Sequence, residues 1–88
     1  MPVYMADREV PGMTMNQLAD AQRAAIDKSR EFTDEGKPVR YIRSTFVPGE
    51  AHLMCLFEAK DADTVRAVNE AAGLPFKRIV EANDLTPA

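Results

Sequence analysis

Cysteine, histidine and tryptophan are scarce in this chain, which has one cysteine, one histidine and no tryptophan among 88 residues. A single cysteine excludes a disulfide within the chain and a zinc site built from several cysteines. No apolar run approaches the ~18–20 residues that cross a bilayer. Residues 1–10 carry Asp7, Arg8 and Glu9 where a signal peptide needs an apolar stretch. We therefore expect a cytoplasmic protein without a membrane partner.

An excess of positive charge is missing as well. The 11 lysines and arginines are outnumbered by 14 aspartates and glutamates, which gives a formal net charge of −3. Bulk attraction to nucleic acid is therefore not expected. The remaining composition, 45% hydrophobic and 28% charged, is that of an ordinary globular chain. A chain of this length has room for one core, so we predict a single domain over residues 1–88.

The chain divides into six segments, most of which are separated by glycine and proline. Four are short and rich in β-branched and aromatic residues, as strands are, and two have apolar residues three or four positions apart, as helices have. The strands are predicted at residues 3–10, 39–47, 53–59 and 78–82. The order strand, helix, strand, strand, helix, strand predicts an α+β fold of the ferredoxin-like, split βαβ type (βαββαβ), in which two helices cover one face of a four-stranded antiparallel sheet.

Both predicted helices have recognisable ends. Thr14 and Gln17 have the spacing of a capping box at the start of the first helix, and Gly36 ends it. Asp61 or Asp63 caps the second helix, which runs to about residue 72. The buried stripes are expected at Leu18, Ala21, Ala25, Ser29 and Phe32 in the first helix and at Val65, Val68 and Ala72 in the second.

The strands are apolar on both faces, although two helices can cover only one face of the sheet. Regular alternation places Leu53, Cys55 and Phe57 opposite Met54, Leu56 and Glu58, and it places Ile42 and Phe46 opposite Val39, Tyr41 and Val47. A sheet with one solvated face should alternate between apolar and polar residues. We therefore predict a homodimer with Met54 and Leu56 at or near the contact. The alternative is a monomer that leaves a few apolar side chains exposed.

His52 and Cys55 are the candidate metal ligands. His52 follows a turn, where an imidazole can bind a metal or move a proton, or can simply be exposed. Cys55 lies among apolar residues, where a free cysteine usually packs as a small hydrophobe. Because the two are three residues apart on one strand, they point to opposite faces and cannot chelate one ion together unless the strand is bulged. A metal site that uses either residue needs carboxylates or a second subunit.

Polar residues in the strands predict a ligand pocket beside the sheet. Its candidate members are Arg8, Tyr41, Arg43, Ser44 and Glu58. Arginines can hold an anion in a bidentate manner, and a carboxylate at the end of an apolar strand face can act as an acid or a base. Alternatively, the arginine stems extend over the sheet, and Glu58 forms a strand-end salt bridge with Arg40 or Arg43. Cys55 and Glu58 alternate along one strand, so both cannot face one simple pocket.

The order and spacing of several short motifs carry a family resemblance. The motifs are Asp7-Arg8-Glu9-Val10-Pro11-Gly12, Thr14 with Leu18, Tyr41-Ile42-Arg43-Ser44-Thr45-Phe46-Val47, Cys55-Leu56-Phe57-Glu58-Ala59, and Ala72-Gly73-Leu74-Pro75 with Arg78-Ile79-Val80-Glu81. Over about residues 3–85 the chain resembles a family of small bacterial proteins of unknown function that includes a nickel-binding protein of ferredoxin-like fold. The resemblance implies a homodimer and, for some members, nickel binding.

One position departs from the resembled family, whose members often have a histidine where this chain has Arg43. An arginine cannot ligate a metal as imidazole does, so this departure weighs against nickel. The architecture also resembles that of dimeric α+β-barrel proteins, which include small monooxygenases and isomerases, but fold does not fix function. Three interpretations follow: a dimer that binds nickel, another divalent metal or a small ligand beside the sheet; a small enzyme with Glu58 as proton-transfer group; or a module that binds a protein partner.

Overall fold

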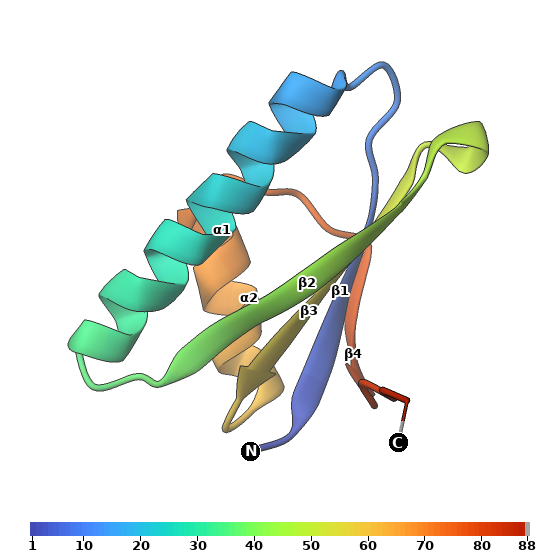
Figure 1. Ribbon diagram of the computed structural model, residues 1–88. Coiled ribbons are helices and arrows are strands. Elements are labelled where there is room, and N and C mark those ends of the chain that lie inside the picture. The colour runs from blue at the N-terminus through green and yellow to red at the C-terminus, as the bar shows by residue number, and fades with distance from the viewer. Residues whose placement is uncertain (88) are drawn as a thin grey trace.

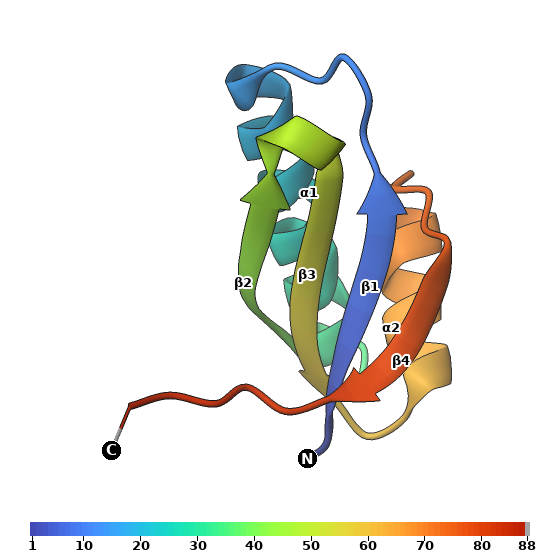
Figure 2. The same ribbon diagram turned by 90° about the vertical axis from the view of Figure 1, so that its right-hand side faces the viewer.

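The computed structural model describes residues 1–87, and its element order confirms the predicted βαββαβ fold. The strands are β1 (Val3–Glu9), β2 (Val39–Val47), β3 (His52–Ala59) and β4 (Arg78–Ala82), and the helices are α1 (Met15–Asp34) and α2 (Ala62–Ala71). A short 3-10 helix, η1 (Pro48–Glu50), joins β2 to β3 where the sequence predicts a hairpin link. The strands form one antiparallel sheet in the order β2-β3-β1-β4, and both helices cover the same face (Figures 1 and 2).

The helix ends follow the predicted capping chemistry. The Thr14 side chain accepts from the Gln17 amide at 3.1 Å, and the Gln17 side chain accepts from the Thr14 amide at 2.8 Å, which completes the capping box. Asp61, and not Asp63, caps α2. Gly36 follows α1 with a φ of 89°, a conformation that glycine adopts without strain. Within residues 1–87, neither helix has the length and apolar character that a bilayer crossing requires.

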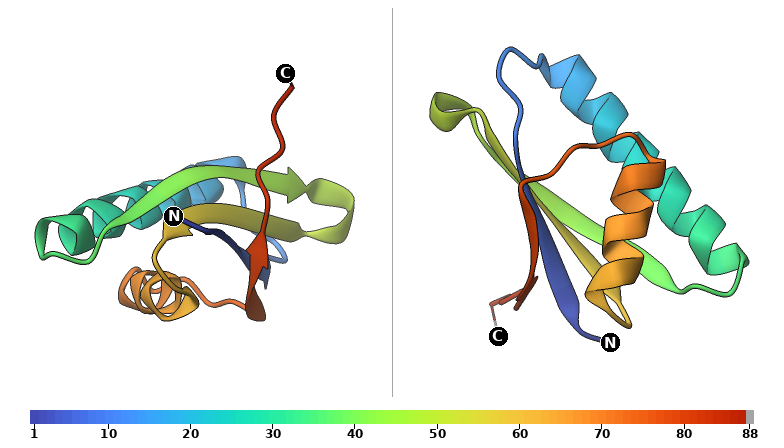
Figure 3. Two further views of the ribbon diagram at one scale, coloured as in Figure 1. Left: turned by 90° about the horizontal axis from the view of Figure 1, so that it is seen from below. Right: turned by 180° about the vertical axis from the view of Figure 1, so that it is seen from behind.

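The face of the sheet beneath the helices holds the core. Alternate residues of β3 are buried there, together with apolar side chains from the other elements; the set is Ala6, Val10, Leu18, Ala25, Val39, Leu53, Cys55, Phe57, Ala59, Val65 and Val68. The two helices do not cover this face evenly. With 20 residues α1 spans the sheet, whereas α2 has 10 and ends partway along it (Figure 3). One end of the sheet is therefore covered by α1 alone.

A β-bulge in β2 decides which of its residues face the helices. The register with β3 shifts between Tyr41 and Arg43, which makes Ile42 the extra residue. Tyr41 and Ser44 consequently lie on the helix-covered face together, although regular alternation puts residues three apart on opposite faces. The prediction that Tyr41 shares the face of Val47 is wrong because the bulge reverses the alternation.

The opposite face of the sheet, covered by neither helix, is here called the open face. Its centre is a row of half-buried apolar residues, since Leu56, Met5 and Val80 are direct neighbours across β3, β1 and β4. Residues 83–87 extend away from β4 toward the far edge of the sheet (Figure 2), where Asp84 pairs with Arg43 of β2 at 3.0 Å. The sheet is therefore apolar at the centre of both faces, as the sequence predicts.

Candidate functional site

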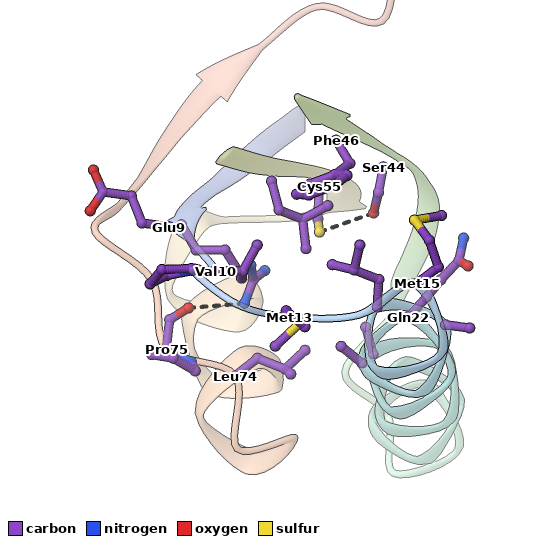
Figure 4. A pocket seen from close by; sticks show the side chains of 17 residues that line it. Glu9, Val10, Met13, Met15, Gln22, Ser44, Phe46, Cys55, Leu74 and Pro75 are labelled. Atoms are coloured by element: carbon purple, nitrogen blue, oxygen red, sulfur yellow. Dashed lines mark hydrogen bonds between the residues drawn. The ribbon is translucent and has the colours of Figure 1, made fainter. Parts of the chain in front are cut away.

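A cavity of about 440 Å³ lies between α1 and the end of the sheet that α2 does not cover (Figure 4). We call it the sheet–helix cavity. Small side chains create it, because α1 presents alanines to the sheet here and the strands present Ser44 and Cys55, so no large side chain fills the space. Most other lining residues are apolar, among them Val10, Met13, Leu18, Phe46, Leu53 and Leu74.

Arg8 brings a positive charge to this cavity. The residue is only 3% exposed. Its Nη2 donates to Asn69 Oδ1 at 2.7 Å and its Nη1 donates to the Pro75 carbonyl at 3.2 Å, whereas its Nε is buried without an acceptor. Asn69 is fully buried, and its amide nitrogen donates to the Val65 carbonyl at 2.8 Å, which fixes the orientation of the amide. Among residues 1–87, no carboxylate lies within 4.0 Å of the Arg8 guanidinium.

A chain of hydrogen bonds runs from α1 into the same cavity. Gln22 donates to the Tyr41 hydroxyl at 2.9 Å, and Tyr41 and Ser44 share a bond of 2.5 Å. Ser44 Oγ in turn donates to Cys55 Sγ at 3.0 Å (Figure 4). Burial raises the pKa of Tyr41 and outweighs the hydrogen bonds from Ser44 and Gln22 that lower it. The hydrogen-bond partner of the Cys55 thiol is thus a hydroxyl and not a base.

Two predicted site residues lie on the open face instead. Glu58 accepts from Arg40 Nε at 3.4 Å, which is the strand-end salt bridge that the sequence offers as an alternative. Arg43 pairs with Asp84. Both arginines are more than half exposed, so these pairs are surface interactions that contribute little to stability.

The structure therefore does not bring the five predicted ligand-binding residues into one pocket. Arg8 and Ser44 line the sheet–helix cavity and Tyr41 contacts it through Ser44, whereas Arg43 and Glu58 lie on the open face. Alternation along β3 separates Glu58 from Cys55, and the bulge in β2 separates Arg43 from Tyr41. Cys55, named in the sequence as a candidate metal ligand, belongs to the cavity lining.

His52, the other candidate metal ligand, contacts Asp7 on the open face. Asp7 also accepts from Arg78 at 3.0 Å. Burial would raise the pKa of Asp7, but the hydrogen bonds from His52 and Arg78 outweigh it and hold that pKa below its ordinary value. Residues 1–87 contain no group of three or more histidines, cysteines or acidic residues that could hold a metal ion. Residues 1–87 of a single chain therefore do not supply a complete ligand set for nickel.

Two features of the site were missed from the sequence alone: Asn69, which is the buried acceptor of Arg8, and the residues of α1 that line the cavity. Asn69 lies four residues after Val65, in the buried stripe of α2, and a polar residue in such a stripe is a signal that a buried partner exists. The alanines of α1 gave no such signal, because alanine in a buried stripe is compatible both with close packing and with a cavity.

Comparisons with known proteins agree with this fold. A family model described as "Nickel responsive protein SCO4226-like" matches residues 4–82. A solved structure, the crystal structure of SCO4226 from Streptomyces coelicolor A3(2), is similar with a TM-score of 0.78 and 24% sequence identity, and the match covers 96% of this chain and 99% of that chain. At this identity the likeness shows a shared fold. No curated protein matches the chain.

Proposed function

The chain belongs to the SCO4226-like family of nickel responsive proteins, and we propose that it is a binding protein whose ligand site is the sheet–helix cavity. A single observation carries the proposal: a cavity of about 440 Å³ has a mostly apolar lining that includes one buried cationic residue, Arg8. Cavities of roughly 300–1,000 Å³ with apolar walls and a few polar groups are the usual form of small-molecule sites. The function is recognition of a small, largely apolar molecule beside the sheet.

Binding is favoured over catalysis by the position of the candidate reactive groups. Glu58, the proton-transfer group of the enzyme hypothesis, lies on the open face and pairs with Arg40. Cys55 does line the cavity, but its hydrogen-bond partner is Ser44, and a thiol nucleophile needs a neighbouring base or cation. The cavity therefore has the features that bind a ligand, an enclosed shape, apolar surface and one charge, and no activated reactive group in its described lining.

A substitution that fills the cavity tests this proposal. Ala21→Trp places an indole in the cavity from α1, and we expect it to abolish saturable calorimetric binding of apolar probes such as decanol and decanoate. Ala67→Trp adds the same side chain on the exposed side of α2 and is the control, which should bind as the parent does. A parent chain that binds neither probe would overturn the assignment of the cavity as a ligand site.

We further propose that the functional unit is a homodimer formed through the open face. The apolar row of Leu56, Met5 and Val80 crosses three strands of that face, with Met54 beside it. Apolar surface of this kind is typical of association sites. Ion pairs lie on both sides of the row along the strands, with Glu58 and Arg40 on one side and Asp7 and Arg78 on the other, which would orient two copies.

Nickel binding is the second candidate function, and the contact between His52 and Asp7 favours it. Imidazole is a good nickel ligand, and association through the open face would supply a second copy of this pair. Since one chain does not fit a nickel site, this candidate requires the dimer.

Calorimetric titration with nickel, cobalt, copper and zinc tests the nickel candidate. His52→Ala should abolish binding, and Cys55→Ser, on the other face, should leave it unchanged. No heat and no thermal shift with any of the four metals would exclude it.

A further inference from the structure

Arg8 is a buried cation that lacks a counter-anion in the described part of its own chain. Both acceptors of its guanidinium, Asn69 Oδ1 and the Pro75 carbonyl, are neutral, and Nε has no acceptor at all. A guanidinium stays charged in proteins and has five N–H donors, so several remain for another partner. Removing a charge from water carries a large cost unless an opposite charge and hydrogen bonds compensate for it. The positive charge of Arg8 is thus left without the anionic partner that would compensate for its burial.

The nearest acidic residues in the sequence do not supply the missing charge. Glu9 lines the same cavity, but its carboxylate pairs with Lys77 at 3.1 Å and is mostly exposed. Asp7 is in the same strand, but it lies on the open face and is held by Arg78 and His52. Strand alternation therefore keeps both carboxylates away from the Arg8 guanidinium.

We propose that the sheet–helix cavity takes an anionic amphiphile, a molecule with a single carboxylate held by Arg8 and an apolar tail of medium length. The inference rests on the proposed ligand site and names its ligand class. Arginine and carboxylate form bidentate, charge-assisted hydrogen bonds, which would compensate the buried guanidinium. Arg8 is the one cationic residue in the described lining, so a single negative charge matches it and a multiply charged phosphate does not.

The apolar part of the cavity fits such a tail. Met13, Leu18 and Phe46 line it, and Met15 lies at its edge with 71% of the residue exposed (Figure 4). Methionine side chains are flexible and polarisable, so they adapt to tails of different shape. An exposed methionine beside an apolar cavity is also a surface that a protruding tail would cover.

The test compares decanoate with decanol, which has the same chain length but no charge, by isothermal calorimetry at pH 7. We expect decanoate to bind the parent about tenfold to a hundredfold more tightly than decanol, as expected for a hydrogen-bonded charge pair. Arg8→Met should lower decanoate affinity to that of decanol and leave decanol affinity unchanged. Arg43→Met removes the same charge from the open face and should preserve the preference for decanoate.

The outcomes distinguish a failure of the proposed ligand class from a failure of the proposed ligand site. Equal affinity for decanoate and decanol, or a preference that survives Arg8→Met, overturns the inference but leaves the cavity as a ligand site. Binding of neither probe overturns both.

If Arg8→Met does not fold, the double variant Arg8→Met/Asn69→Leu replaces it, because this variant leaves neither member of the buried pair without its partner. The NMR signal of Arg8 Nε–H gives an independent measurement. Decanoate should shift that signal and decanol should not, and an unmoved signal at saturating decanoate contradicts the proposal.

Discussion

Replacing Asn69 with leucine removes the best-placed acceptor of the Arg8 guanidinium, and we expect this change to destabilise the fold strongly. The bond lost is 2.7 Å long, buried and made to a charged donor. Such bonds contribute roughly 1.5–3 kcal/mol, and a buried charge left with fewer acceptors adds to the loss. Leucine has the same branching at Cγ as asparagine, so its apolar side chain offsets a small part of this. We expect a loss of about 2–3 kcal/mol in the free energy of unfolding.

A double-mutant cycle isolates the interaction between the two residues. Arg8→Met alone leaves Asn69 Oδ1 without its donor, and we expect it to cost about 1 kcal/mol. Arg8→Met/Asn69→Leu replaces both partners with apolar side chains, a change that is often nearly neutral. The single losses should therefore not add, and the coupling energy should be about 3 kcal/mol.

Urea unfolding followed by circular dichroism measures each free energy by linear extrapolation. For a domain of this size, the loss for Asn69→Leu corresponds to a fall of about 10–20 °C in Tm. Asn16→Leu, at an exposed position in the first turn of α1, is the matched control and should stay within about 0.5 kcal/mol of the parent. A loss below about 1 kcal/mol for Asn69→Leu, or single effects that simply add, would refute the reasoning.

Four further predictions follow from the two faces of the sheet. Leu56→Glu places a charge in the apolar row of the open face and should convert a dimer into a monomer in sedimentation velocity, whereas a parent that sediments at the chain mass of 9.8 kDa would contradict the dimer. Glu58→Gln removes a surface ion pair and should cost less than about 1 kcal/mol without changing decanoate affinity, and a loss of affinity would place the ligand site on the open face. Cys55 is 4% exposed and lines the cavity, so decanoate should slow its reaction with a thiol reagent, and an unchanged rate at saturation would count against the site. Burial raises the pKa of Tyr41 and favours the neutral phenol in the folded state, so its stabilising contribution should be present below the ordinary pKa of about 10 and disappear as the pH rises through the folded pKa. The difference between alkaline spectroscopic titrations of the parent and Tyr41→Phe should give a Tyr41 pKa above 10, and a value at or below 10 would contradict this account.

The fold could be predicted from the sequence because local signals agree with the final topology. The capping box of Thr14 and Gln17 sets the start of α1, and the alternation of apolar residues sets the faces of β3, in which every second residue from Leu53 to Ala59 is buried. Period, caps and turns each depend on residues a few positions apart, so they can be recognised without knowing the tertiary structure.

The site was less predictable because its geometry depends on contacts between distant segments. Arg8 and Asn69 are 61 positions apart, and nothing near either residue in the sequence shows that they meet. The bulge at Ile42 has no glycine or proline to mark it, yet it determines the face of every earlier residue of β2 relative to the later ones. The cavity is equally hard to predict, because it forms only where several elements all present small side chains to the same place.

The alternation of β3 also places the two candidate binding surfaces back to back in a thin sheet. Cys55 lines the sheet–helix cavity, while Met54 and Leu56, its immediate neighbours, belong to the open face. Likewise, Arg8 of β1 reaches the cavity and Asp7 contacts His52 on the other side. Because adjacent residues serve opposite faces, the cavity and a dimer contact do not compete for side chains. Both would nevertheless depend on the same backbone ladder, since Arg8 pairs with Leu53 and Asp7 with Met54 in one register. A one-residue slip would exchange the two sets and turn the carboxylate of Asp7 toward the cavity in place of Arg8. The register that forms the core therefore also fixes the sign of the charge at the cavity.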